Sequence, residues 1–375
     1  MVLSDMDEIQ LLNLTLYNFK NYESLNIELH PGINCFLGNN GSGKTNLLDA
    51  IHYLSNCKSY FNPVDSQNII FGGDQFAITG EFLRNGQSEQ IICSVRRNQR
   101  KIFKRNHKEY ERLAEHIGHL PCVMITPYDI ELIWDGSEVR RKFLDSTLAQ
   151  LSRGYLEDLI AYNHALLQRN TVLKTYSKQA HFPDDFLEVW DVQLAERAAR
   201  IHEARNSFLR DFQVVFQRVY REISGAAENV SFHYSSELND ATMEQLLRNN
   251  NRRDKMLERT SAGVHRDDLE FLMEGHILKK FASQGQQKSF LFALKFSQYL
   301  FIKESALVKP ILLLDDFFDK IDEQRVTNIM RWISANDVGQ LFITDTSPIR
   351  MPEILKAANV SFKAWQTSGG KLEVV

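Results

Sequence analysis

The chain has 375 residues, of which 43% are hydrophobic and 25% are charged, and its formal net charge is −4. This composition is ordinary for a globular protein, and a chain of this length is expected to form two or three lobes instead of one core. The balanced charge excludes a uniformly basic protein, so any surface for nucleic acid must be local.

Membrane and secretion signals are missing from the sequence. No stretch approaches 18 consecutive apolar residues, and the acidic residues 1–8 lack the apolar region of a signal peptide. The four cysteines include no C-x-x-C pair, which favours reduced core residues over a metal site or a disulfide framework: Cys35, Cys57, Cys93 and Cys122. We therefore expect a cytoplasmic protein without a membrane partner.

Residues 9–37 alternate in polarity in the way that half-buried strands do. Apolar side chains recur at every second position on both sides of a turn near Asn21, at Leu12, Leu14, Leu16, Leu25, Ile27 and Leu29. The short, mainly apolar stretch 32–37 instead predicts a buried strand, and residues 46–54 predict an amphipathic helix.

Between that strand and that helix lies an octapeptide that fits the phosphate-binding pattern G-x-x-x-x-G-K-[ST]. We predict that it binds a nucleoside triphosphate; its members are Gly38, Asn39, Asn40, Gly41, Ser42, Gly43, Lys44 and Thr45. Glycines let consecutive backbone N–H groups face a phosphate, and the helix N-terminus adds a favourable dipole. We expect Lys44 to reach the β- and γ-phosphates of ATP and the Thr45 hydroxyl to bind Mg²⁺.

Residues 68–108 read as a second β-rich region beside the phosphate-binding loop. Two strands, 76–82 and 90–95, are joined by an Asn85-Gly86 dipeptide, which is typical of a tight hairpin turn. Gln67, just before this region, is a candidate for the Q-loop glutamine of ABC-type ATPases. The alternative is an ordinary polar residue at the surface.

The end of the β-rich region is strongly basic. Residues 96–108 contain Phe103 and no acid, and the cations that we propose for DNA contacts are Arg96, Arg97, Arg100, Lys101, Lys104 and Arg105. Such a cluster suits phosphate contacts and predicts salt-sensitive binding that tolerates any base sequence. The alternative is a solvated hairpin edge that its cations protect from aggregation.

From about residue 137 to 225 the apolar period becomes helical. A first stripe runs from Leu144 to Leu166, and a second helix is expected to begin at Pro183. Two such helices joined by a short polar loop predict an antiparallel hairpin that forms an arm. The three cations at 140–142 and the pair at 252–253 are weaker candidates for DNA contacts, and Arg266 could serve either DNA or the nucleotide.

These patterns predict an α/β fold with an ABC-type P-loop ATPase core, a β-rich subdomain and an inserted helical-hairpin arm. The N-terminal part of the ATPase domain, with the phosphate-binding loop, is expected to span residues 1–136. The arm is expected to span 137–260. The C-terminal part of the ATPase domain is expected to span 261–375.

The second half of the nucleotide site follows an apolar run at 310–314 that ends in Asp315 and Asp316. A buried parallel strand that delivers a carboxylate to the edge of the sheet is what Mg²⁺ coordination beside the phosphate-binding loop requires. We assign Asp315 to the metal and Asp316 to orienting or activating the attacking water. The alternative is that the two acids only cap the next element.

Ser283-Gln284-Gly285-Gln286-Gln287-Lys288 precedes that strand and opens a helical run. A hydroxyl, a glycine and amides at a helix N-terminus can form an anion site. The hexapeptide resembles the signature motif of ABC-type ATPases, which implies that Ser283, Gly285 and Gln286 contact the γ-phosphate held by a second subunit. In isolation it would be read as an ordinary helix start.

Two further motifs lie in the C-terminal part. Residues 319–322 resemble the D-loop, and residues 341–346 resemble the strand that leads to the switch position. Most ABC ATPases carry histidine at the switch, whereas this chain offers Thr344-Asp345-Thr346. The group that senses the γ-phosphate is therefore left open.

Taken along its whole length, the chain resembles the RecF family of bacterial recombination-repair ATPases. The resemblance rests on six segments: Asn18–Tyr22, Gly38–Asn46, Arg140–Asp145, Gly263–Leu269, Ser283–Lys288 and Leu312–Asp316. The Gln-Gly-Gln-Gln form of the signature is the most specific of them. Departures are small: Lys288 stands where the family usually has arginine, Val264 where proline is common, and Phe317-Phe318 follows the acidic pair.

This resemblance implies an ATP-gated homodimer that binds DNA in its cleft and hydrolyses ATP slowly, with stimulation by DNA. It also implies recruitment to gapped or junction DNA, where the protein helps mediator proteins load the recombinase on single strands. The ATPase would then act as a switch and not as a metabolic enzyme.

Two other functions compete with this interpretation. An ATP-driving subunit of a membrane transporter would leave the arm and the basic stretch unexplained, and the switch histidine is lacking. A short-armed defence or structural-maintenance ATPase is the other alternative, although the chain has no attached nuclease domain or long coiled coil.

Overall fold

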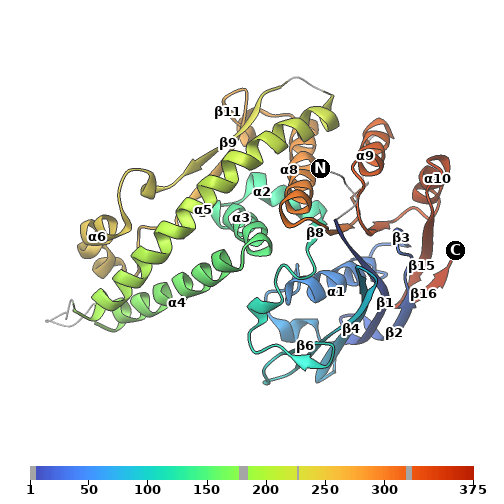
Figure 1. The fold of residues 1–375 in the computed structure, drawn as a ribbon, viewed down its shortest axis with the longest axis horizontal. Coiled ribbons are helices and arrows are strands. Elements are labelled where there is room, and N and C mark those ends of the chain that lie inside the picture. Colours follow the sequence, from blue (N-terminus) through green and yellow to red (C-terminus); the bar gives the residue numbers. More distant parts are fainter. Residues whose placement is uncertain (1–5, 177–184, 226–227, 318–322) are drawn as a thin grey trace. The chain divides into compact units, whose positions relative to one another are not determined.

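The computed structural model describes the chain in four stretches: residues 6–176, 185–225, 228–317 and 323–375 (Figure 1). The described chain divides into two compact units. One takes in residues 1–129, 222–224 and 292–375, and the other takes in residues 130–221 and 225–291. The predicted D-loop, residues 319–322, lies outside the described residues.

A six-stranded sheet forms one layer of the first unit within the described stretches. In sheet order its strands are β16 (Lys371–Val374), β15 (Phe362–Ser368), β3 (Ile33–Leu37), β14 (Leu341–Asp345), β13 (Ile311–Leu314) and β8 (Cys122–Ile125). All pair in parallel except β16, and every residue of β3, β8, β13 and β14 is buried. Such unbroken apolar runs are expected where helices or a second sheet cover both faces.

A second, mostly antiparallel sheet completes the β-structure of this unit. Its strands follow the order β12 (Val308–Lys309), β1 (Asp7–Phe19), β4 (Gln75–Arg84), β5 (Gln87–Arg96), β6 (Ile102–Arg105) and β7 (Lys108–Glu109), and β2 (Tyr22–Glu28) pairs with the other side of β1. The predicted hairpin turn is confirmed: Asn85 and Gly86 join β4 to β5 with φ angles of 50° and 77°. Positive φ at both turn residues matches the twist of the two strands.

Helix α1 (Lys44–Asn56) lies between the two sheets. It packs against β4 and β5 of the antiparallel sheet and against β8 and β14 of the parallel sheet (Figure 1). Its sandwiched position explains why ten of its residues are buried. Other helical elements of this unit are α9 (Glu323–Ala335), α10 (Arg350–Ala357), the part of α8 (Gln284–Ala306) from residue 292, and the 3-10 turns η2 (Asp65–Asn68) and η3 (Leu113–Glu115).

The second unit is mainly helical. In chain order its elements are α2 (Glu131–Trp134), α3 (Ser137–Leu151), α4 (Arg153–Tyr176), α5 (Asp185–Ser224, as far as Arg221), β9 (Val230–Ser235), η5 (Glu237–Asn239), α6 (Met243–Leu257), β10 (Asp268–Met273), β11 (His276–Ile277), α7 (Leu278–Phe281) and the start of α8. Another 3-10 turn, η4 (Pro127–Ile130), leads into it.

The antiparallel hairpin of the arm consists of α4 and α5 (Figure 1). Arg197 and Arg200 of α5 both pair with Asp158 of α4, which fixes the two helices together. The prediction of one helix through residues 144–166 is wrong: the extended backbone of Ser152 separates α3 from α4. The predicted start at Pro183 lies outside the described residues.

The boundaries of the helical unit differ from those expected from sequence. The arm was expected to end at residue 260 because strand-like patterning resumes there. In the structure, β10 pairs with β9 and β11 inside the helical unit, so residues 261–291 belong to it. Alternating residues can indicate a strand, but they do not specify its partner.

Candidate nucleotide-binding site

The phosphate-binding loop connects β3 to α1 and depends on two glycines. Gly38 has a φ of 149°, and a Cβ atom there would lie 2.4 Å from the carbonyl oxygen of Thr367. Gly43 has a φ of 110°, and its Cβ would lie 2.5 Å from Asn21 Nδ2. At Gly38 a side chain would overlap the backbone of Thr367, and at Gly43 the positive φ disfavours any residue with a Cβ, so the sequence pattern has a steric cause.

Inside the loop, two polar groups have the arrangement that a phosphate requires. Lys44 Nζ donates to the carbonyl oxygens of Gly38 (2.7 Å) and Asn39 (3.1 Å) although its side chain is 3% exposed. Ser42 Oγ is buried and has no hydrogen-bond partner in the described chain. A buried donor without a partner is unfavourable unless a ligand satisfies it, and phosphate oxygens are suitable acceptors.

The predicted metal-side residues meet at the carboxyl edge of the parallel sheet. Thr45 Oγ1 donates to Asp315 Oδ1 over 2.9 Å, although the residues are 270 positions apart. Burial raises the pKa of Asp315 to about 6, although hydrogen bonds from Thr344 and Thr45 act in the opposite direction. A hydroxyl and a carboxylate in contact beside a phosphate-binding loop form a donor set that suits Mg²⁺.

Asp316 lies one residue further on, with a left-handed φ of 39°. Its Oδ1 is 4.0 Å from Lys44 Nζ, and its side chain is 26% exposed. The two neighbouring acids therefore have different environments: Asp315 is held among hydroxyls, and Asp316 is accessible to water. This difference is compatible with the separate roles predicted for them.

Thr344 connects the two acids, and the sequence alone did not identify it. Its hydroxyl donates to Asp315 Oδ1 (2.9 Å) and accepts from the backbone N–H of Asp316 (2.7 Å). The next residue, Asp345, forms an ion pair with Arg350 instead. The sequence showed that residues 344–346 contain no switch histidine. It did not show which of these three side chains would contact Asp315 and Asp316.

A second group that sequence analysis missed holds the loop from the first residue of β2 and the turn before it. Tyr22 Oη donates to the carbonyl oxygen of Gly43 (3.1 Å), and Asn21 Nδ2 donates to that of Ser42 (3.4 Å). Asn46 Nδ2 in turn donates to Asn21 Oδ1 (2.6 Å). The segment Asn18–Tyr22 contributed to the family resemblance, but its spacing gave no indication of this contact.

The signature segment belongs to the other unit. Ser283 and Gln286 cap helix α8 reciprocally: Ser283 Oγ accepts from the Gln286 N–H, and Gln286 Oε1 accepts from the Ser283 N–H. Gln286 Nε2 also donates to Glu228 (3.0 Å). The capping box orients the first turn of the helix, and Ser283 remains exposed.

Gln67 lies in η2 and is exposed. Its side chain makes no hydrogen bond to the phosphate-binding loop or to the paired acids within the described part of the chain. Asp65, at the start of the same 3-10 turn, accepts a hydrogen bond from Tyr53 Oη and forms an ion pair with Lys101 (2.8 Å).

The basic stretch is divided between two faces of its hairpin. Lys101 and Arg105 share the inward face with buried Phe103. Lys101 forms an ion pair with Asp65 and donates to the carbonyl oxygen of Cys57. Arg105 forms a bidentate ion pair with Glu89. The other four predicted DNA contacts make no ion pair within the described residues: Arg96, Arg97, Arg100 and Lys104. Strand alternation separates side chains that the sequence grouped together.

Other features leave the nucleotide site as the main candidate. All four cysteines are unbridged and buried. No group of three metal-binding side chains occurs in the described ranges. None of the helices there has both the length and the apolar character needed to cross a membrane.

Comparison with known proteins supports the predicted fold. The RecF/RecN/SMC N-terminal domain family matches residues 10–368. The DNA replication and repair protein RecF of Flavobacterium johnsoniae is 45% identical over 95% of this chain and 99% of the relative. RecF of Parabacteroides distasonis is 44% identical over 97% of this chain and 98% of the relative.

Solved structures agree with these sequence relatives. The recombination mediator protein RecF with ATP, from the RecFOR pathway, has a TM-score of 0.90 at 28% identity, and the match covers 99% of both chains. The Smc head domain of Pyrococcus furiosus has a TM-score of 0.56 at 15% identity over 98% of this chain and 96% of the head domain, which bears on the fold alone. The predicted ABC-type core with an arm is thereby confirmed.

Proposed function

Since this chain belongs to the RecF family of the RecF/RecN/SMC group, we propose that it is an ATP-dependent DNA-binding protein of recombinational repair and replication restart. One observation carries the proposal: Thr45, Asp315 and Thr344 form a connected set beside a glycine loop with an unpaired buried hydroxyl. This arrangement fits the triphosphate and the metal ion of ATP.

Each residue of the set has a role that follows from its chemistry. Lys44 neutralises the β- and γ-phosphates, and the loop N–H groups bind the same oxygens. Thr45 and Asp315 hold Mg²⁺, which supplies charge neutralisation of the phosphates. Asp316, with its partly exposed carboxylate, orients the attacking water, and Thr344 holds both acids in position.

The signature segment acts on the nucleotide of a second copy of this chain. Ser283 is exposed at the N-terminus of α8, where an anion is favoured by the helix dipole. Gly285 allows close approach of a γ-phosphate, and Gln286 keeps the turn in place through the capping box. ATP would thus join two copies, and slow hydrolysis would release them.

In the cytoplasm, the dimer would bind gapped or junction DNA and help mediator proteins load the recombinase. RecF names among relatives and the RecFOR description of the solved structure support this role. The hairpin cations without ion pairs, Arg96, Arg97, Arg100 and Lys104, offer phosphate contacts. The transporter alternative is disfavoured because the full-length relatives are DNA replication and repair proteins.

Sedimentation with and without ATP and gapped duplex DNA tests this proposal. The expected result is a monomer without ATP and a DNA-bound dimer with ATP. Ser283→Arg should bind ATP but remain monomeric, whereas Asp316→Asn should dimerise and fail to hydrolyse ATP. Lys44→Ala should lose ATP binding altogether. A chain that binds ATP but shows neither dimer nor DNA complex would contradict the function.

A further inference from the structure

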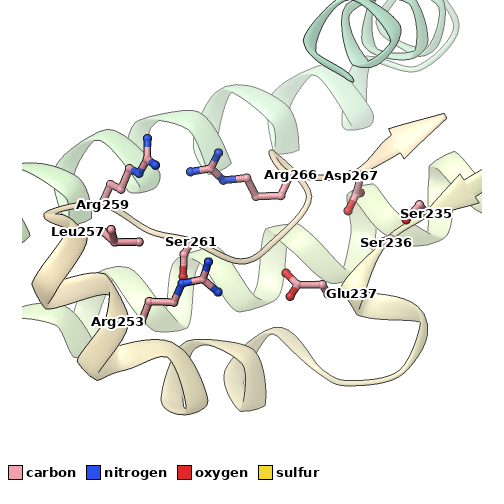
Figure 2. Close-up of a pocket in the computed structure, with 9 residues that line it drawn as sticks. All are labelled: Ser235, Ser236, Glu237, Arg253, Leu257, Arg259, Ser261, Arg266 and Asp267. Atoms are coloured by element: carbon pink, nitrogen blue, oxygen red, sulfur yellow. The ribbon is translucent and has the colours of Figure 1, made fainter. Parts of the chain in front are cut away.

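An arginine-lined cavity of about 350 Å³ opens in the second unit (Figure 2). Its basic residues come from two places: Arg253 lies in the C-terminal half of α6, and Arg259 and Arg266 lie in the segment that leads to β10. All three side chains are exposed. The sequence marked Arg253 and Arg266 as candidates for contacts, but neither the nucleotide site nor the basic hairpin described above uses this cavity.

The three cations have no counter-charge of their own. In the part of the chain that the structure describes, no carboxylate lies within ion-pair distance of Arg253, Arg259 or Arg266. Figure 2 shows the guanidinium groups of Arg259 and Arg266 directed toward one another. Like charges in this arrangement repel each other, and an anion placed between them converts the repulsion into attraction.

The acids of the cavity leave this positive region uncompensated. Asp267 is already engaged, because its Oδ2 accepts from Arg205 (3.0 Å) and from Tyr234 Oη. Glu237 is exposed and points into the cavity in Figure 2, but it forms no ion pair with any of the described residues. The cavity therefore carries three unpaired cations against one unpaired carboxylate.

The walls of the cavity are held rigidly from behind. Buried Asp254 accepts from Ser261 N (2.9 Å) and Ser261 Oγ (2.6 Å) through one oxygen and from Arg169 through the other (2.7 Å). Gly263 has a φ of 121°, and a Cβ there would lie 2.6 Å from Met243. The hydrogen bonds from Ser261 tie the middle of the segment that bears Arg259 and Arg266 to Asp254 of α6, so part of the ordering that anion binding requires is already in place.

From this geometry we propose that the cavity binds a phosphate of a nucleic-acid backbone, between Arg259 and Arg266, with Arg253 as a third donor. Guanidinium groups suit phosphate because their N–H groups match its oxygens. The inference rests on the proposed function, since it gives the DNA-binding protein a phosphate contact on its arm.

The surface beside the cavity favours a chain of phosphates over a single free anion. On α6, residues 248–253 read Arg-Asn-Asn-Asn-Arg-Arg without an acid, and Arg248, Asn249 and Arg252 are exposed. Arginine and asparagine side chains are among the usual partners of the nucleic-acid backbone. The donors therefore continue along the helix from the cavity, as a backbone with regularly spaced charges requires.

The test uses the full chain with ATP and a gapped duplex, across a series of KCl concentrations. The variant Arg259→Gln with Arg266→Gln should bind DNA about tenfold more weakly, and its slope of log affinity against log salt should fall by about one. Glu237→Gln removes the opposing carboxylate and should tighten binding about two- to fivefold. Lys174→Gln, an exposed cation of the same unit outside the cavity, should change neither quantity.

Several outcomes overturn the inference without affecting the proposed function. If wild type forms its ATP-dependent DNA complex and the double variant has the same affinity and salt slope, the cavity binds no backbone phosphate. The same conclusion follows if the double variant loses only the thermal stabilisation given by inorganic phosphate, because the ligand is then a free anion. Arg259→Lys with Arg266→Lys keeps the charge, so an intermediate DNA affinity for that folded variant supports the inference. Failure of wild type to bind DNA would instead remove the proposed function.

Discussion

Thr344 Oγ1 donates a hydrogen bond to Asp315 Oδ1 over 2.9 Å and accepts one from the backbone of Asp316 over 2.7 Å. One hydroxyl on β14 therefore sets the positions of two acids that follow β13. The usual switch histidine is lacking here, and the adjacent strand supplies a threonine that reaches both acids directly.

Removing this hydroxyl should impair hydrolysis more than ATP binding. In Thr344→Val the shape is nearly kept, but Asp315 and the Asp316 N–H each lose a partner, which should cost about 1–3 kcal/mol of stability. We expect hydrolysis to fall about 10- to 100-fold, because misplaced groups lose their alignment with the reacting atoms. Steady-state ATPase assays and equilibrium ATP binding separate the two effects, and Thr344→Ser should retain most activity. Wild-type turnover in Thr344→Val would contradict the role of the hydroxyl.

Tyr22 should affect nucleotide binding although it lies on a strand outside the loop. Tyr22→Phe removes the hydrogen bond to the carbonyl oxygen of Gly43 and leaves that acceptor buried, at a cost of about 1 kcal/mol. A looser loop should bind ATP several-fold more weakly in calorimetric titration. Tyr17→Phe is the matched control, because Tyr17 is 48% exposed on the neighbouring strand. Equal ATP affinities for the two variants would show that this hydrogen bond does not support the loop.

The basic hairpin should separate into a stabilising face and a DNA-binding face. Lys101→Gln breaks the pair with Asp65 and should lower the free energy of unfolding by about 1–3 kcal/mol while DNA affinity stays near wild type. Arg96→Gln with Lys104→Gln should leave stability within about 0.5 kcal/mol but lower DNA affinity and reduce the salt slope by about one to two. Urea unfolding and DNA titration measure the two quantities. The opposite pattern would assign the inward face to DNA.

His116 should make stability depend on pH. Burial lowers the pKa of His116 to about 4, although the hydrogen bond from its ring to the carbonyl oxygen of Leu54 (2.7 Å) acts in the opposite direction. The unfolded chain, with an ordinary histidine pKa near 6.5, binds the proton more readily between these values. The free energy of unfolding should therefore fall as pH drops from about 6.5 to about 4, by up to roughly 3 kcal/mol from this group.

Urea unfolding between pH 7.5 and 4.5 measures this dependence. His116→Gln keeps a donor for Leu54 and removes the titration, so its stability should fall less over the same range. Buried His52 and half-buried His265, whose pKa values are also lowered to about 4, remain in this variant and account for the residual slope. An unchanged slope would show that His116 contributes nothing to it.

The site divides clearly into what was predictable and what was not. The phosphate-binding loop, its flanking strand and helix, and the acidic pair after 310–314 were all identifiable from patterns within a few residues. Contacts such as Tyr22 with Gly43 were not, because the sequence carries no record of which strands lie next to the loop. The division of the basic hairpin into two faces was also missed, because a count of cations does not take into account that alternate residues of a strand face opposite sides.

The sequence by itself determined the local chemistry of this protein. Gly38, Gly43 and Lys44 specify a phosphate-binding turn because backbone conformation and residue type act over short distances. Only the tertiary structure decided that β14 lies between β3 and β13, which brings Thr45, Asp315 and Thr344 together. The physical reason is that strand pairing joins segments up to hundreds of residues apart, and the choice of partner depends on packing across the whole sheet.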